Sequence, residues 1–225
     1  MQVIAVMPAY KEAPRIHAAV TGCLPHVSHV LVIDDGSQDG TAEAAEAAGA
    51  IVLRHTVNRG QGAALKTGTL AALSLGAEII IHIDADGQHD PAGIEALIAP
   101  LIEGTHDVVF GSRFLSISPE GMPRSRRVLL HGIRYFNTYI LGISARLSDP
   151  QSGLRAMNAP AAQGIVFTQD GMAHCSEILR MATRSWRYKE VPALVRYTEY
   201  SLAKGQKATD ALKIVWKLFL GSLQR

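Results

Sequence analysis

The chain has 225 residues, of which 48% are hydrophobic and 19% are charged, with 20 glycines and 10 prolines. These proportions are typical of a globular protein and exclude a disordered, collagen-like or low-complexity chain. The net charge is only +2, but residues 1–110 carry 5 basic and 13 acidic residues, whereas residues 111–225 carry 17 and 7. An acidic first half suits metal and neutral sugar or base contacts, and a basic second half suits phosphate groups or an anionic membrane surface. Unevenly charged solvated surface is the alternative.

The first half alternates short apolar runs with helical patterns. We expect strands within residues 2–7, 29–37, 51–55, 77–88 and 106–113. Helices are expected over residues 12–24, from Thr41 as N-cap to Gly49, from the turn at 58–64 to Leu75, and over 91–103. Such alternation predicts an α/β fold with a mostly parallel central sheet and helices on both faces.

The second half is less regular. We expect a helix with a broad apolar face over residues 124–147, then a polar turn and a short element over 148–158, a helix over 172–186 and a strand over 188–200. An amphipathic helix is expected to end the chain over residues 203–225. Its stretch 208–220, like the stretch 128–143, suits either peripheral membrane contact or packing on the domain or on a second subunit.

Three classes of protein are disfavoured by simple counts. Cys23 and Cys175 are the only cysteines, too few for a disulfide framework, and no Cys/His cluster has zinc-site spacing. The chain starts without a basic leader or a long apolar core, so we expect no secretory signal and a cytoplasmic location. No stretch approaches the roughly 18 uninterrupted apolar residues of a membrane span.

Acidic residues follow two of the expected strands, where ligand sites of such sheets lie. Asp84 and Asp86 come just after a buried strand, and two carboxylates two residues apart in a tight turn can face one Mg²⁺ or Mn²⁺ ion that also binds substrate phosphates. Gln88 is a further contact, and His89 a candidate neighbour of that site. The alternative is an acidic turn that merely ends the strand.

The pair Asp34 and Asp35 ends another strand and is followed by Gly36. A carboxylate there can accept hydrogen bonds from a nucleobase or a ribose hydroxyl, although Asp, Gly and Ser also form turns without any ligand. The segment NRGQGAA (58–64) brings glycines that allow a close backbone approach, with Lys66 following. It lacks the dinucleotide-binding and phosphate-loop patterns, so a nucleoside triphosphatase is disfavoured.

Six blocks in order carry a family resemblance: VMPAYKE, VIDDGSQDGT, NRGQGAALKTG, IDADGQHDP, DVVFGSR and DPQSGLRAMN. Over residues 3–200 the chain resembles glycosyltransferase family 2, and is most similar to dolichyl-phosphate mannose synthases and bacterial polyprenyl-phosphate sugar transferases. The resemblance implies a GT-A nucleotide-sugar-binding fold, a GDP- or UDP-sugar donor, Mg²⁺ or Mn²⁺, and inversion at the anomeric carbon.

Roles implied by the resemblance fall on matching positions. The nucleotide-sugar candidates are Pro8, Tyr10, Glu12, Asp34, Asp35, Lys66, Gln88 and Lys204. The metal and diphosphate candidates are Asp84, Asp86 and Gln88. The catalytic candidates are Asp86, Arg113, Arg127 and Asp149, with Arg126 as an alternative to Arg127. Ser152 and Gly153 are candidates for lining the acceptor side together with Asp149. Lys207, like Lys204, is a candidate for contact with a donor or acceptor phosphate. Lys11 and Gln61 depart from the family pattern, where Asn and Lys are common.

The resulting hypothesis is a single domain over residues 1–225, with a nucleotide-sugar and metal half (1–113) and an acceptor half (114–225). It transfers a hexose, mannose or glucose, to a polyprenyl phosphate at the inner face of the cell membrane, with no nucleic-acid partner. A phosphate acceptor is already anionic and needs no general base. If the acceptor is a sugar hydroxyl, Asp149 is the candidate base. A nucleotidyltransferase and a binding domain without activity remain alternatives.

Overall fold

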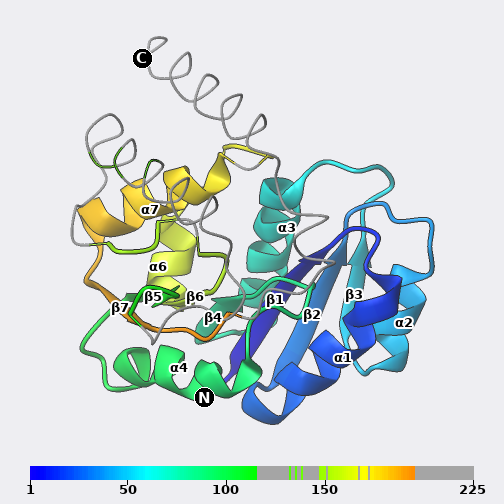
Figure 1. The fold of residues 1–225 in the computed structure, drawn as a ribbon, viewed down its shortest axis with the longest axis horizontal. Coiled ribbons are helices and arrows are strands. Elements are labelled where there is room, and N and C mark those ends of the chain that lie inside the picture. Colours follow the sequence, from blue (N-terminus) through cyan, green and yellow to red (C-terminus); the bar gives the residue numbers. More distant parts are fainter. Residues whose placement is uncertain are drawn as a thin grey trace.

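The computed structural model describes residues 1–115, 147–150, 152–166, 168–171 and 173–195, together with positions 132, 135 and 138. Its described strands form one sheet in the order β3-β2-β1-β4-β6-β5-β7 (Figure 1). The strands are β1 (Val3–Ala9), β2 (His29–Asp34), β3 (Ile51–Arg54), β4 (Ile79–His82), β5 (Val108–Ser112), β6 (Arg155–Asn158) and β7 (Tyr188–Pro192).

The helices lie between these strands. They are α1 (Ala13–Cys23), α2 (Thr41–Ala47), α3 (Gln61–Ser74), α4 (Ile94–Ile102), α6 (Ala159–Gly164) and α7 (His174–Ser185), with two short 3₁₀ turns, η1 (Leu24–His26) and η2 (Pro91–Gly93). Every strand and helix expected in the first half is present, and most end within a few residues of their expected ends; β4 is shorter than the expected stretch 77–88 and ends at His82, before the acids. One detail is wrong: Thr41 is the first residue of α2 and not its N-cap, because its hydroxyl accepts the Glu12 backbone N–H and donates to Asp39.

The mostly parallel sheet is confirmed, with one reversed strand. The pairs β1·β2, β1·β4, β2·β3 and β5·β7 are parallel, whereas β6 runs antiparallel between β4 and β5. The sequence predicted only a short element there. Because β6 begins opposite the end of β4, with Arg155 paired to His82, the segment that precedes β6 reaches the same edge as the segments that follow the parallel strands.

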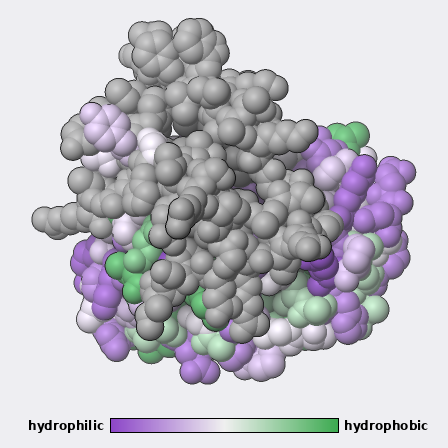
Figure 2. Space-filling view, in the orientation of Figure 1, coloured by the Kyte–Doolittle hydropathy of each residue, from purple (hydrophilic) through white to green (hydrophobic). Residues whose placement is uncertain are grey.

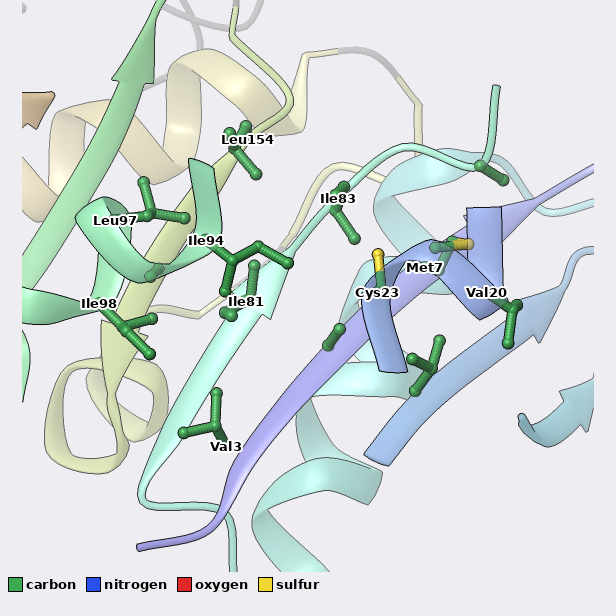
Figure 3. Close-up of a cluster of buried hydrophobic side chains, with 14 of the residues drawn as sticks. Val3, Met7, Val20, Cys23, Ile81, Ile83, Ile94, Leu97, Ile98 and Leu154 are labelled. Atoms are coloured by element: carbon green, nitrogen blue, oxygen red, sulfur yellow. The ribbon is translucent and has the colours of Figure 1, made fainter. Parts of the chain in front are cut away.

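Helices cover both faces of the sheet, as the alternation predicted (Figure 1). On one face, α1, α2 and α4 pack on alternate side chains of the central strands; Figure 3 shows part of this core, including Ile81, Ile94 and Leu97. On the other face, α3, α6 and α7 enclose a second core that includes Ile80, Leu65 and Ile178. All four residues of β4 are buried, so the turn that follows β4 extends from a rigid, completely covered strand.

No helix among the described residues is long and apolar enough to cross a bilayer. On the face shown in Figure 2, exposed hydrophobic residues of the described part lie in small groups among hydrophilic ones. The predicted helices over 124–147 and 203–225, and the end of the predicted strand beyond residue 195, lie largely outside the described residues, and β7 ends at Pro192.

Candidate active site

The strand register brings the predicted site residues to one edge of the sheet. Ala9, near the end of β1, pairs with Asp34 at the end of β2, and Val6 pairs with His82 at the end of β4. At the end of β5, Ser112 pairs with Pro192 of β7. Every predicted site residue that the structure describes, except Lys66, lies on or beside these strand ends. Lys66 is on α3 with its side chain exposed.

The end of β1 presents three of the nucleotide-sugar candidates. Pro8 is within the strand, Tyr10 is exposed, and Glu12 is buried at the start of α1. Lys11 between them adopts a left-handed conformation with φ of 56°, and its ammonium lies 5.3 Å from the centre of the Tyr10 ring. Asn tolerates this conformation better than Lys, so the Asn that is common at this position in the family suits the backbone better than the Lys of this chain.

The neighbouring carboxylates of β2 are largely engaged by the protein itself. Asp34 is fully buried; its Oδ1 accepts the Ser37 backbone N–H at 3.0 Å, and its Oδ2 lies 3.6 Å from Arg54 Nε. Asp35 binds the NRG turn: its Oδ1 accepts the Arg59 N–H at 3.0 Å, and its Oδ2 accepts the Gly60 N–H at 2.7 Å. His55 Nδ1 lies a further 2.7 Å from Asp35 Oδ1. Asp35 therefore organises the turn that begins α3.

The two acids that follow β4, Asp84 and Asp86, have pKa values that are shifted in opposite directions. Asp84 Oδ1 accepts a 2.8 Å hydrogen bond from Gln61 Nε2, and its Oδ2 lies 3.8 Å from His89 Nε2. Burial acts to raise the pKa of Asp84, but His89 and the more distant Arg155 hold it below its ordinary value, so this carboxylate is ionised. Burial and the negative charge of Asp84 raise the pKa of Asp86.

This donor set fits a divalent cation. Asp84 and Asp86 are half-buried carboxylates that repel each other, and a cation between them removes that repulsion. No cluster of three or more His, Cys, Asp or Glu ligands exists among the described residues. Mg²⁺ and Mn²⁺ suit such a site because they are commonly held by one or two carboxylates and complete their coordination with substrate phosphates and water.

Gln88 and His89 complete this turn. The Gln88 backbone N–H donates to Asp86 Oδ1 at 3.0 Å, which fixes the Asp86 side chain. Gln88 Nε2 and His89 Nδ1 are buried, and neither has a hydrogen-bond partner among the residues that the structure describes. Buried polar atoms of this kind are normally satisfied by water or a ligand. His89, a candidate neighbour in the sequence, does lie against Asp84.

A second charged group lies at the end of β5. Asp149 Oδ2 accepts hydrogen bonds from Arg113, at 2.5 Å from Nε and 3.1 Å from the backbone N–H, and both side chains are buried. Glu190 of β7 in turn accepts the backbone N–H groups of Ser148 and Asp149. Asp149 Oδ1 is buried and has no hydrogen-bond partner within the described part of the chain. The segment before β6 is thereby anchored to both β5 and β7.

The same segment touches the metal candidates. Gly153 packs so closely on Asp84 that a Cβ atom at position 153 would lie 2.1 Å from Asp84 Oδ2. Ser152 is buried and its hydroxyl accepts the Leu154 backbone N–H, which shapes the turn. Asp149 and Gly153 therefore connect the Arg113 ion pair with the Asp84 carboxylate, two groups that the sequence predicted separately.

A buried polar cluster beneath Asp84 was not predicted. Arg155 is 1% exposed, and its Nε donates to His82 Nδ1, while His82 Nε2 is 2.9 Å from Thr69 Oγ1. Burial and the charge of Arg155 lower the pKa of His82, which is therefore neutral. Burial acts to raise the pKa of Cys175, but the charge and hydrogen bond of His174 lower it to about 7. Only the three-dimensional fold brings Thr69, His82 and Arg155 close to the adjacent pair His174 and Cys175.

Several site residues predicted from the sequence lie in parts of the chain that the structure does not describe. Arg126, Arg127, Lys204 and Lys207 lie outside the described residues, as do the amphipathic stretch 208–220 and most of 128–143. Their roles stay predictions.

Known proteins resemble this chain along most of its length. The sequence model described as "Glycosyl transferase family 2" matches residues 4–157. A UDP-N-acetylglucosamine–dolichyl-phosphate N-acetylglucosaminyltransferase from Methanococcus voltae is 32% identical, over 96% of this chain and 94% of the relative. A polyprenol monophosphomannose synthase from Mycolicibacterium smegmatis is 29% identical, over 88% and 78%.

A solved structure supports the fold independently. Glucosyl-3-phosphoglycerate synthase from Mycobacterium tuberculosis, crystallised with Mn²⁺ and UDP-glucose, superposes with a TM-score of 0.74 at 20% identity, over 99% of this chain and 78% of that structure. The fold is thus that of the GT-A glycosyltransferases, as the resemblance implied. With the family match and the acids at the carboxyl edge of the sheet, the chain belongs to glycosyltransferase family 2 and is a glycosyltransferase.

Proposed function

We propose that this enzyme transfers a hexose, with inversion, from a nucleotide diphosphate sugar to a polyprenyl phosphate at the inner face of the cell membrane. The observation that carries the choice of acceptor is the buried ion pair of Arg113 and Asp149. The carboxylate best placed to act as a general base in this region already accepts two hydrogen bonds from Arg113 through Oδ2. An acceptor that is already anionic avoids the need for such a base.

In the proposed reaction the donor binds across the ends of β1, β2 and β4. Pro8, Tyr10, Glu12 and Asp34 border the nucleoside, and Asp84 and Asp86 hold Mg²⁺ or Mn²⁺. The metal, when bound, supplies positive charge for the diphosphate leaving group. Asp35 acts indirectly, by fixing the turn at Arg59 and Gly60. Asp149 orients Arg113 toward the anionic acceptor, which the guanidinium attracts and aligns.

The relatives support both substrates. The names of the Methanococcus and Mycolicibacterium proteins refer to a dolichyl-phosphate acceptor and a polyprenol monophosphomannose product. The structural neighbour was crystallised with UDP-glucose and Mn²⁺. We therefore extend the nucleotide-sugar donor and the lipid phosphate acceptor to this chain.

A paired-acceptor assay tests the proposal. The purified enzyme is incubated in detergent with Mn²⁺ or Mg²⁺ and labelled GDP-mannose, UDP-glucose or UDP-N-acetylglucosamine. One reaction contains undecaprenyl phosphate, and its matched control contains undecaprenol, which lacks only the phosphate. We expect labelled lipid only with the phosphate, and only when metal is present. Transfer to undecaprenol or to simple sugars with no transfer to the lipid phosphate would overturn the proposal.

The second candidate function is transfer to a hydroxyl acceptor with Asp149 as base, which the unpartnered Asp149 Oδ1 favours. Asp149→Asn separates the two. If Asp149 only orients Arg113, we expect a loss of about tenfold in transfer, with an unchanged pH profile. If Asp149 is the base, transfer falls by about 10²–10⁴-fold and the acidic limb of the pH profile disappears.

A further inference from the structure

We propose that Gln61 is a positioning residue for Asp84, and that its uncharged amide holds one oxygen of this carboxylate while leaving the full negative charge of Asp84 to the cation. The inference rests on the metal site of the proposed function. Its basis is the 2.8 Å hydrogen bond from Gln61 Nε2 to Asp84 Oδ1. An ionised carboxylate only accepts hydrogen bonds, so the nitrogen of the amide must face it.

The backbone of Gln61 is held from two sides. Before it, the Gly60 N–H donates to Asp35 Oδ2; after it, the Gly62 and Ala63 N–H groups donate to the Asp170 carbonyl oxygen at 2.8 and 3.2 Å. Gly60 has φ of 104° and packs so tightly that a Cβ atom there would lie 2.5 Å from the Asp170 oxygen. The first turn of α3 therefore has one arrangement, which directs the side chain of Gln61 to Asp84.

The other oxygen of Asp84 is restricted as well. Gly153 packs against Oδ2, and His89 approaches it to 3.8 Å. With the hydrogen bond from Gln61 on Oδ1, the plane of the carboxylate is fixed before any cation binds. Preorganised ligands of this kind bind metal more tightly, and loss of such an outer partner typically weakens affinity by about 10–100-fold.

The charge of the side chain at position 61 affects how strongly Asp84 attracts a cation. A lysine at position 61 also donates a hydrogen bond, but its positive charge would offset part of the charge of Asp84 and weaken the attraction of that carboxylate for the cation. Glutamine orients the carboxylate without either effect. The two contributions, orientation and neutrality, are therefore separable by substitution.

The test measures Mn²⁺ binding directly, with no nucleotide and no turnover. The wild type, Gln61→Leu, Gln61→Lys and the control Gln163→Leu, an exposed glutamine on α6, are titrated with Mn²⁺ and the free ion is followed by electron paramagnetic resonance. We expect Gln61→Leu to bind about tenfold more weakly, Gln61→Lys more weakly still, and the control to match the wild type. Thermal unfolding without metal is recorded for all four proteins.

The outcomes are distinct. Equal affinity of Gln61→Leu and the wild type would overturn the role of Gln61 while leaving the metal site intact. Absence of Mn²⁺ binding by the wild type would overturn the metal site, and this inference with it. Tighter binding by Gln61→Lys than by Gln61→Leu would overturn the importance of neutrality. A purely structural role would lower the unfolding temperature and the number of sites, but not the affinity of the folded protein.

Discussion

Two pairs of acids follow β2 and β4, the strands on either side of β1, and the protein uses them differently. Asp35 accepts hydrogen bonds from a turn and from His55, so the fold itself uses its charge. Asp86 accepts one backbone hydrogen bond and is destabilised by burial and by Asp84. The same sequence signal thus marks a structural acid in one place and a ligand-ready acid in the other. The difference lies in the number of hydrogen-bond donors that the protein supplies: the turn at Arg59 and Gly60 gives Asp35 two backbone N–H groups, whereas Asp86 receives one from Gln88.

The largest expected effect comes from removing the ligand-ready acid. We expect Asp86→Ala to lower transfer by about 10³-fold, through loss of a charge that we propose to hold the metal. Because the pKa of Asp86 is raised in the folded protein, the stability of the fold falls as the pH rises from the ordinary value of 3.8 through the raised pKa, and at pH 7 the charged carboxylate destabilises the fold. The metal-free variant should therefore unfold at a higher temperature than the wild type at pH 7.

Glu95→Ala, which removes a highly exposed carboxylate on α4, is the matched control and should change neither property. Assays of transfer and calorimetry without metal check both parts. Near-normal turnover in Asp86→Ala would contradict the ligand role.

We expect Asp35, in contrast to Asp86, to stabilise the folded protein. Asp35→Ala removes the acceptor of two backbone N–H groups and of His55 in a partly buried network around a buried carboxylate, and we expect a loss of about 3 kcal/mol in the free energy of unfolding. Urea denaturation measures it. A loss below about 1 kcal/mol, the typical value for one ordinary hydrogen bond, would mean that Asp35 is not committed to the fold.

An acid at the opposite edge of the sheet extends the comparison. Asp107, just before β5, accepts hydrogen bonds from Arg187 and Asn158, and the hydrogen bond from Arg187 is the main cause that lowers its pKa to about 2. Because Arg187 is largely exposed, we expect Asp107→Asn to cost only about 1 kcal/mol at pH 7.

The direction of the pKa shift of Asp107 determines how its contribution to stability changes with pH. A lowered pKa stabilises the folded state above the ordinary value of 3.8, and this contribution disappears as the pH falls toward about 2. The difference in unfolding free energy between wild type and Asp107→Asn should be constant from pH 7 to 5 and clearly smaller at pH 3. A difference that persists unchanged at pH 3 would argue against the ionised pair as its source.

The smallest expected effect concerns the backbone beside the nucleotide-sugar candidates. Lys11 has φ of 56°, which costs a non-glycine residue about 1 kcal/mol. Lys11→Asn should raise the unfolding free energy by about 0.5 kcal/mol, because Asn tolerates this conformation, whereas Lys11→Ala should give no gain. Chemical denaturation of the two variants side by side checks this. Equal stability of both would show that backbone strain at position 11 is negligible.

The sequence predicted the first half well because its signals are local. Apolar runs such as that of β4 end at acids, and the parallel register then places Asp34 and Asp84 at one edge. The strand β6 was not predicted as antiparallel, since its four residues include Arg155 and Asn158 and its partners come from distant parts of the chain.

Contacts between residues that are distant in the sequence were not predicted either. The ion pair of Arg113 and Asp149 joins positions 36 residues apart, and each of them was predicted only as a separate candidate. Gln61 was noted for its departure from the family pattern, but its contact with Asp84 depends on how Asp35 and Asp170 fix the start of α3. No spacing in the sequence encodes that geometry.

The reversed strand β6 has an evolutionary consequence. The chain leaves the sheet after Ser112 and re-enters it at Arg155 on the same edge, and the contact of Arg113 with Asp149 pins the two ends of this excursion together. Because a longer connection between two fixed points costs little extra closure entropy, we expect insertions between Phe114 and Leu147 to leave the register of β5 and β6 unchanged. If residues 114–225 form the acceptor half as we propose, exchanging this connection between family members would change the acceptor while the strand ends proposed to bind the donor stay unchanged.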